Sequence, residues 1–104
     1  MNSILIAMTL LAADQIGQGN HNRSIEVDGR YRSYLIHIPK DYKPEEPSPV
    51  VLVFHGAGTN AAIMIPFCGM NEKADKAGFI AVYPNGTGLG PFQTFNAGGL
   101  VGKM

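Results

Sequence analysis

A five-residue apolar run that leads directly into a glycine-rich turn constrains the fold of this chain more than any other feature. Every residue of Val50–Phe54 is apolar and three are β-branched, which is typical of a strand buried in a parallel sheet. We therefore expect helices to cover both faces of this strand. The turn that follows is His55-Gly56-Ala57-Gly58. A glycine-rich turn after a strand exposes backbone N–H groups, and such groups can stabilise a developing oxyanion.

Two interpretations of this turn are open at the level of the sequence. In one, the N–H of Ala57 or its neighbour faces a substrate carbonyl oxygen, and Gly56 and Gly58 leave the approach unobstructed. In the other, the turn is only a tight connection between a strand and a helix, because glycine after a parallel strand is common in α/β folds. For His55 we expect a structural role, in which the ring braces the glycine loop through a hydrogen bond to backbone.

The same turn matches a second motif, which belongs to a different class of function. This motif is Gly-x-Gly-x-x-Ala, the alanine form of the dinucleotide-binding fingerprint. Its residues here are Gly56-Ala57-Gly58-Thr59-Asn60-Ala61. The fingerprint needs an acidic residue near the end of the next strand to hold the ribose hydroxyls, and Tyr83-Pro84-Asn85-Gly86 offers none. A dinucleotide-binding, Rossmann-like module is therefore the alternative hypothesis.

The segments before the apolar run predict a β-hairpin and a loop. Ser24–Val27 and Tyr31–Ile38 flank Asp28-Gly29, a dipeptide that tolerates the positive φ angles of a type I′ turn. Pro39–Pro49 carries four prolines, and a segment of this composition sustains neither a strand ladder nor a helix. We therefore expect an exposed connection between the hairpin and the apolar strand.

The segments after the turn predict a crossover from strand through helix to strand. Two segments favour helices, Asn60–Phe67 and Asn71–Ala77. In the second helix, Asn71 is the predicted N-cap and Gly78 is the predicted C-terminal stop. Phe79–Tyr83 is a further apolar strand. Residues 86–102 hold six glycines with little periodicity, so no regular element is predicted there.

Length and composition limit the class of protein. With 104 residues, the chain forms one domain at most, whereas large one-domain α/β enzymes often need roughly 200 to 250 residues. Eight basic and eight acidic residues create no field that would hold nucleic acid, so no such partner is expected. His21, His37, His55 and Cys68 are isolated in the sequence, which predicts no metal site, and a single cysteine excludes an internal disulfide.

The N-terminal residues, 1–22, have features of an export signal and a linker. Ile4–Ala13 is apolar with the length of a signal-peptide h-region, but it is too short to span a bilayer. No basic residue precedes it, since the first is Arg23, so cleavage stays open. Residues 14–22 are polar and contain glycine, which predicts a linker before a folded domain at residues 23–104. We expect an extracellular or periplasmic location without a membrane anchor.

The sequence contains no evident catalytic nucleophile. Ser24, Ser33 and Ser48 are the only serines after the N-terminal run. None of them lies between glycines at a sharp strand-to-helix turn, which is where an α/β-hydrolase holds its serine. Without an activated nucleophile and a base within reach, no Ser-His-Asp triad can be assembled from these residues.

Several blocks of the chain resemble, in the same order, the N-terminal half of secreted α/β-hydrolases of the polyhydroxybutyrate depolymerase and feruloyl esterase type. Blocks that recur in order are more specific than any single one. The blocks are Arg23–Arg30, Tyr34–Pro39, Pro49–Gly56, Phe67–Asp75, Gly78-Phe79, Val82–Gly88 and Thr94–Gly98.

This resemblance implies the N-terminal portion of an α/β-hydrolase fold, with an antiparallel hairpin, parallel strands and covering helices in an incomplete sheet. It also implies that the strand at 79–83 lies between the hairpin and the strand at 50–54. The family hydrolyses carboxylic esters, such as polyesters or plant cell-wall esters, with a Ser-Asp-His triad and no cofactor. The loop at residues 55–58 then matches part of the oxyanion hole. The triad is expected beyond Met104, so we expect the 104-residue chain to be inactive by itself.

Overall fold

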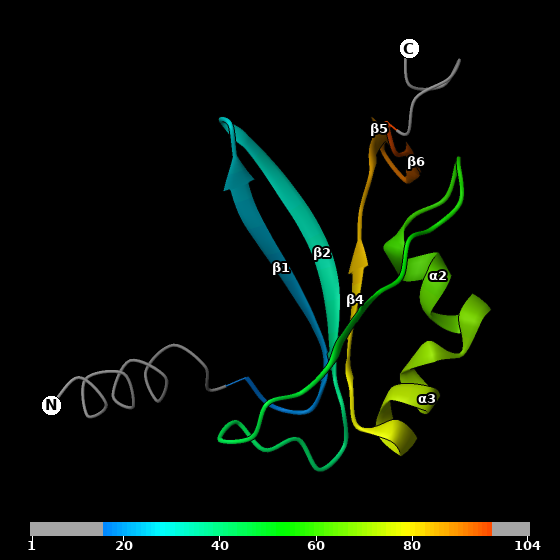
Figure 1. Ribbon diagram of the computed structural model, residues 1–104. Coiled ribbons are helices and arrows are strands. Elements are labelled where there is room, and N and C mark those ends of the chain that lie inside the picture. Colours follow the sequence, from blue (N-terminus) through cyan, green and yellow to red (C-terminus); the bar gives the residue numbers. More distant parts are fainter. Residues whose placement is uncertain (1–15, 97–104) are drawn as a thin grey trace, which may run out of the picture.

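The computed structural model describes residues 16–96, which form two sheets and two helices (Figure 1). The predicted export segment, residues 4–13, lies outside the described residues. No helix in the described part is long and apolar enough to cross a membrane. In chain order the elements are β1 (Gly19–Val27), β2 (Arg30–Ile38), β3 (Val50–Leu52), α2 (Ala61–Cys68), α3 (Met70–Ala77), β4 (Ile80–Pro84), β5 (Thr87–Leu89) and β6 (Phe92–Thr94).

The larger sheet is mixed and has the strand order β1-β2-β4-β3. β1 pairs with β2 and β2 pairs with β4 in antiparallel fashion, whereas β3 and β4 are parallel. β4 therefore lies between the hairpin and β3, as the family resemblance implied. In the described part of the chain β3 is an edge strand. A mixed sheet of this order with two helices is consistent with part of an α/β fold.

β1 and β2 form the predicted hairpin. Asp28 and Gly29 have φ angles of 51° and 75°, and a type I′ turn requires positive φ at both central residues. β1 begins at Gly19, inside the segment predicted to be linker, because pairing continues from the turn as far as Gly19 opposite Ile38. Regular secondary structure therefore begins four residues before Arg23, where the folded domain was predicted to start.

The two helices lie close to their predicted positions, but α3 begins differently. Asn60 caps α2, since its side chain accepts a hydrogen bond from the Ile63 N–H at 3.1 Å. α3 begins after Gly69, so Asn71, the predicted N-cap, lies inside the first turn. Its side chain instead accepts a hydrogen bond from a tyrosine hydroxyl of β4. Gly78 ends α3 in the left-handed region with φ of 80°, as predicted.

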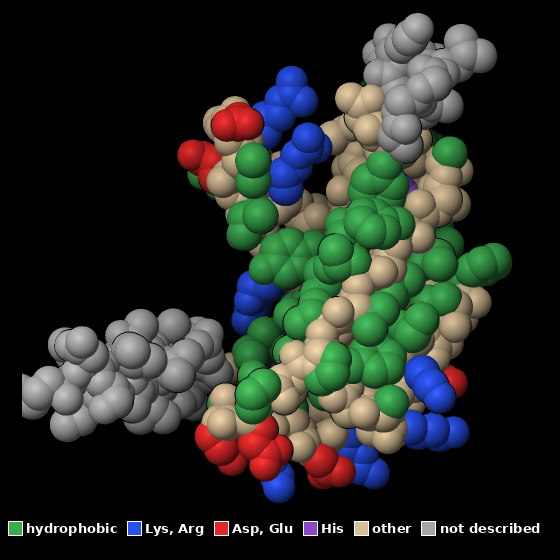
Figure 2. Space-filling view, viewed as in Figure 1, with side chains coloured by type: hydrophobic (Ala, Val, Ile, Leu, Met, Phe, Trp, Pro, Cys, Tyr) green, Lys and Arg blue, Asp and Glu red, His purple; other side chains and the backbone are tan. Residues whose placement is uncertain are grey.

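Both helices pack against the same face of the sheet, and the other face stays open in the described part of the chain. Val50, Leu52 and Phe54 are 57%, 56% and 55% exposed, whereas Val51 packs against the core. The expectation of helices on both faces is therefore wrong for residues 16–96. Figure 2 shows hydrophobic side chains gathered over the region of β3 and β4. The buried core residues are Val53, Ala61, Ala74, Ala81 and Tyr83.

β5 and β6 form a short antiparallel hairpin directly after β4, where the sequence predicts no regular element. A Cβ atom at Gly86 would collide with the backbone of Thr94, so this close approach requires glycine. Gly90, with φ of 57°, and Pro91 connect the two strands. The glycines of this segment thus serve close backbone contact, which hydrophobic periodicity does not reveal.

Candidate functional site

The His55 ring fixes the glycine-rich turn through both of its nitrogens. Nε2 accepts a hydrogen bond from the Gly86 N–H at 3.1 Å, which places the ring proton on Nδ1. Nδ1 donates to the Gly56 carbonyl oxygen at 2.7 Å. The residue is only 4% exposed. The predicted role of His55 as a brace to backbone is therefore confirmed, and neither nitrogen is available to act as a general base.

β6 and the residue after it support the turn from the other side. The Gly58 N–H donates to the Gln93 carbonyl oxygen at 2.7 Å, and the Gln93 N–H donates to the Thr59 carbonyl oxygen at 3.0 Å. The Phe95 ring packs on the His55 ring with 4.5 Å between centroids. Phe95 lies in one of the blocks that carry the family resemblance, but the sequence did not predict that Phe95 or Gln93 supports the turn, because they act through stacking and backbone pairing. The turn is thereby held on both sides.

Ala57 keeps a backbone donor that the rest of the turn does not use. The N–H of Gly58 is bonded to Gln93, whereas the N–H groups of Gly56 and Ala57 have no acceptor within residues 16–96. Gly56, Ala57 and Gly58 are all exposed. A fixed backbone with a free, solvent-facing N–H can donate to a developing negative charge without rearranging. Of the predicted oxyanion residues, Gly58 thus has its N–H engaged, whereas the N–H groups of Gly56 and Ala57 are available.

Asn85 links the end of β4 to the hairpin and to α2. Its Oδ1 accepts a hydrogen bond from the Ala61 N–H at 2.9 Å, and its Nδ2 donates to the Ser33 hydroxyl at 3.0 Å. Asn60 accepts from a second N–H of the same helix end, that of Ile63. A dinucleotide would need these helix N–H groups for its pyrophosphate. The arrangement therefore opposes the alternative hypothesis of a Rossmann-like module.

The three histidines contact no serine within the described residues. His21 bonds the Gly17 carbonyl oxygen, and the rings of His37 and His55 each use both nitrogens for other partners. Ser33 instead accepts from an asparagine amide. In residues 16–96 no group of three metal-ligating side chains gathers, and Cys68 is a free, half-buried thiol. The described chain holds a turn that can donate hydrogen bonds and no assembled nucleophile.

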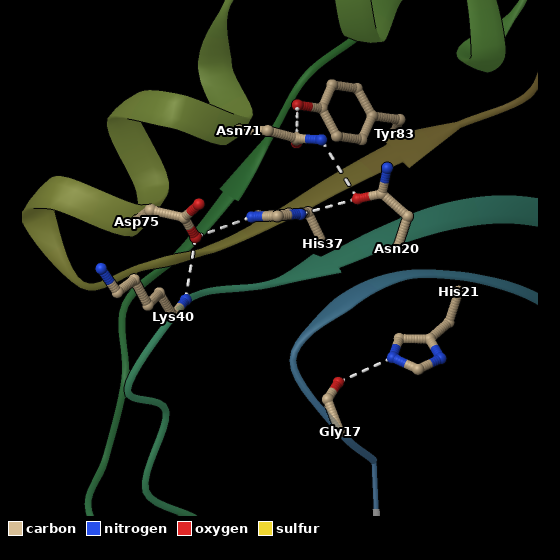
Figure 3. Close-up of polar contacts among 8 residues, drawn as sticks. All are labelled: Gly17, Asn20, His21, His37, Lys40, Asn71, Asp75 and Tyr83. Carbon is tan, nitrogen blue, oxygen red and sulfur yellow. Dashed lines mark hydrogen bonds and ion pairs between the residues drawn. The ribbon is translucent and has the colours of Figure 1, made fainter.

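A second polar cluster lies where α3 meets β1 and β2 (Figure 3). His37 is 8% exposed and bonds Asn20 Oδ1 through Nδ1 at 2.6 Å and Asp75 Oδ1 through Nε2 at 2.9 Å. The Lys40 backbone N–H donates to the same Asp75 oxygen at 2.8 Å. This backbone bond, and then the bond to His37, lower the pKa of Asp75 below its usual 3.8. Because both His37 nitrogens are engaged, the cluster serves to join elements.

Tyr83 extends this cluster into the core. Its hydroxyl donates to Asn71 Oδ1 at 2.5 Å, and Asn71 Nδ2 donates to Asn20 Oδ1 at 3.1 Å (Figure 3). The tyrosine is fully buried. Burial, and then the neighbouring Cys68 thiol, raise its pKa above the usual 10.0. None of these polar contacts was predicted, since their partners are far apart in the sequence.

Comparison with known proteins finds likeness at the level of the fold. No family model matches the sequence, and no curated protein matches it. Two crystal structures of pOPH are similar: the native protein, and a serine-to-alanine variant in complex with pNPB. Each has a TM-score of 0.51 and 17% sequence identity, and the match covers 71% of this chain and 22% of the pOPH chain. The chain thus shares the fold of a minor part of pOPH, which supports a distant relationship.

Proposed function

We propose that this chain is part of a serine carboxylic-ester hydrolase, of the polyhydroxybutyrate depolymerase or feruloyl or acetyl esterase type, and that it contributes the oxyanion loop. The observation that carries this proposal is the braced turn at residues 55–58, in which the Ala57 N–H has no acceptor in the described chain. The fold shared with part of pOPH, a hydrolase-like chain, supports it. The pOPH complex with pNPB was made with a serine-to-alanine variant, which fits a serine nucleophile in that protein.

In such a reaction the serine oxygen attacks the ester carbonyl carbon, and negative charge develops on the carbonyl oxygen. A backbone N–H that already points at this oxygen lowers the barrier, because it needs no reorganisation as the charge forms. The Ala57 N–H takes this role. Gly56 and Gly58 carry no side chain that would block the approach of the ester, and His55 holds the backbone without exchanging a proton itself.

The chain alone lacks the groups that make and break the ester bond. The serine, aspartate and histidine of the triad are supplied by polypeptide outside these 104 residues, and no cofactor takes part. The whole protein acts on a polyester or a plant cell-wall ester, and it works outside the cytoplasm, either extracellularly or in the periplasm. We expect the 104-residue chain assayed by itself to be inactive toward p-nitrophenyl butyrate.

The test uses the protein in which this chain is joined to the triad-bearing polypeptide. Ala57→Pro removes the backbone N–H, and Ala57→Gly, the matched control, keeps it. Loss of a single oxyanion donor lowers kcat by roughly 100- to 1,000-fold. We expect that loss for Ala57→Pro with KM little changed, and turnover within about threefold of the parent for Ala57→Gly. Equal kcat values for the two folded variants would show that the Ala57 N–H is not the donor.

A further inference from the structure

A groove lies on the open side of the main sheet, between the β1–β2 hairpin and the segment from β4 to Asn96. Its volume is about 470 Å³, within the range of roughly 300 to 1,000 Å³ typical of small-molecule sites. Its walls are mainly apolar. The apolar lining residues on which the argument rests are Ile25, Tyr34, Val82, Pro84 and Phe95.

Among residues 16–96, Arg32 is the single charged residue that lines this groove. It lies directly opposite Ile25 in the β1–β2 register and is partly buried. Glu26 and Asp28 follow Ile25 in the chain, yet neither lines the groove, and Arg32 makes no ion pair within residues 16–96. Figure 2 shows basic side chains at the hairpin, beside the hollow that separates it from the apolar area. A guanidinium without a carboxylate therefore stands at one wall of an apolar groove.

We propose that this groove binds a monocarboxylate with an apolar chain or ring. The carboxylate pairs with the Arg32 guanidinium, whose planar donors match its two oxygens. The apolar part of the ligand lies along the wall formed by Val82, Pro84 and Phe95. Hydroxyl and amide groups nearby, at Thr94 and Asn85, complete a lining of few polar groups on an apolar surface, which is the usual make-up of small-molecule sites.

Charge complementarity selects this ligand over two others. An alcohol of the same length would fill the apolar wall and leave the Arg32 guanidinium unpaired. An amine would place a second cation beside the first. This proposal rests on Arg32 and the groove and not on the Ala57 N–H, so octanoate binding and ester turnover test the two proposals separately.

The test measures binding of octanoate to the full 104-residue chain by equilibrium dialysis at low micromolar protein concentration. We expect saturable binding at one site, with 1-octanol and octylamine each at least tenfold weaker, since a charge-assisted bidentate pair contributes at least a factor of about ten. Arg32→Gln should weaken octanoate binding at least tenfold. Arg30→Gln, the matched control on the same strand outside the groove lining, should leave it within about twofold.

A second variant keeps Arg32 but gives its guanidinium a carboxylate partner within the chain. Ile25→Glu sets a carboxylate opposite Arg32 at a half-exposed position, so the internal ion pair should compete with octanoate and weaken its binding at least tenfold. Far-ultraviolet circular dichroism and the urea midpoint confirm that each variant is folded. Equal affinity for octanoate and octanol, equal effects of Arg30→Gln and Arg32→Gln, or no octanoate binding up to millimolar concentration would each overturn the proposal.

Discussion

Tyr83 is the residue whose chemistry is most altered by its place in the fold. It is fully buried, and its hydroxyl bonds Asn71 in α3. Its raised pKa lies above the unfolded value of 10.0, so the unfolded chain releases this proton first. Stability is therefore unaffected below about pH 10 and falls as the pH rises beyond it.

Alkaline titration followed by tyrosine absorbance tests this prediction. Of the four tyrosines, we expect the fully buried Tyr83 to ionise only when the chain unfolds. Tyr83→Phe should remove this late component, and the control Tyr31→Phe, at a 77% exposed position, should leave it in place. Four tyrosines that titrate together below the unfolding pH would contradict the burial of Tyr83.

Asp75 gives the opposite pH dependence at the same scale. Its pKa is lowered in the folded chain, first by the Lys40 N–H and then by His37. Its contribution to stability is therefore present above the unfolded pKa of 3.8 and is lost as the pH falls through the lower folded pKa. Urea unfolding of the parent and of Asp75→Asn should differ by a constant amount between pH 5 and pH 7 and converge as the pH falls below about 4.

Glu72→Gln is the control for this measurement, because it changes an exposed carboxylate on the same helix. We expect the difference between parent and Glu72→Gln to be small throughout the acid range. A difference between parent and Asp75→Asn that persists unchanged at the lowest pH would contradict the role of the Asp75 carboxylate.

The roles of single residues could be predicted where their partners are close in the sequence. The role of His55 followed from its place between an apolar strand and glycines, and one of its partners, Gly56, is adjacent in the sequence. The His37–Asp75 pair escaped prediction because the residues lie on different elements and are joined only when α3 packs on the sheet. Asn71 was misassigned as a cap, since its amide suits either a helix end or a buried tyrosine partner.

At the scale of elements, Asn85 joins the end of β4 to α2 and β2. It bonds the first N–H of α2 and the Ser33 hydroxyl of β2 from the end of β4. Asn85→Ala leaves that N–H without its acceptor, and we expect the free energy of unfolding to fall by about 1 to 2 kcal/mol. Urea unfolding at neutral pH measures this loss.

Asn85→Asp is the matched control for this variant. It keeps a side-chain oxygen for the Ala61 N–H, and the Ser33 hydroxyl can turn to donate to the second carboxylate oxygen. We expect most of the stability to be retained. A loss for Asn85→Asp as large as that for Asn85→Ala would mean that the Oδ1 bond to α2 is not what holds the element in place.

Strands and helices with regular patterns were found from the sequence, and the glycine-based hairpin was not. The Asp28-Gly29 turn and the stop at Gly78 act through local backbone preferences, so they could be predicted. β5 and β6 are short and mostly exposed, so they carry no hydrophobic period. Gly90-Pro91 between them was the available signal, since glycine at the first central position suits a two-residue hairpin turn.

At the scale of the whole molecule, the described chain exposes a sheet edge and an apolar face together. The Val53 N–H and the Pro49 carbonyl oxygen form hydrogen bonds with β4 and its neighbouring backbone. Because successive residues of a strand direct their backbone groups to opposite sides, those of Val50, Leu52 and Phe54 point away from β4 along the free edge. No charge or internal proline protects this edge. We therefore expect the chain to self-associate as its concentration rises.

Leu52→Lys tests this expectation, because a charge at an edge position opposes strand pairing. Its side chain is already 56% exposed, so the fold should tolerate the change. Phe67→Lys is the control, since it places the same charge at an 82% exposed apolar position on α2. Sedimentation velocity should show reduced association for Leu52→Lys alone. Equal reduction in both variants would assign the effect to net charge.

The apolar run at residues 50–54 explains why the whole molecule was only partly predictable. An unbroken apolar strand indicates burial on both faces, and the strand order implied by the resemblance is confirmed. An apolar strand does not reveal which segments cover each face of the sheet, and both helices of the described residues pack on the same face. The resemblance thus predicted the strand's place in the sheet, whereas the apolar pattern did not reveal its open face.

The most direct test of the central claim is the nucleotide sequence that follows codon 104 in the source DNA, translated in all three frames. If this chain contributes the oxyanion loop of an ester hydrolase, one frame should encode a Gly-x-Ser-x-Gly segment followed by an aspartate and a histidine. Joining that frame to this chain should then give turnover of p-nitrophenyl butyrate. If no frame encodes such a segment, or if the 104-residue chain turns over the ester by itself, the proposed division of the active site is contradicted.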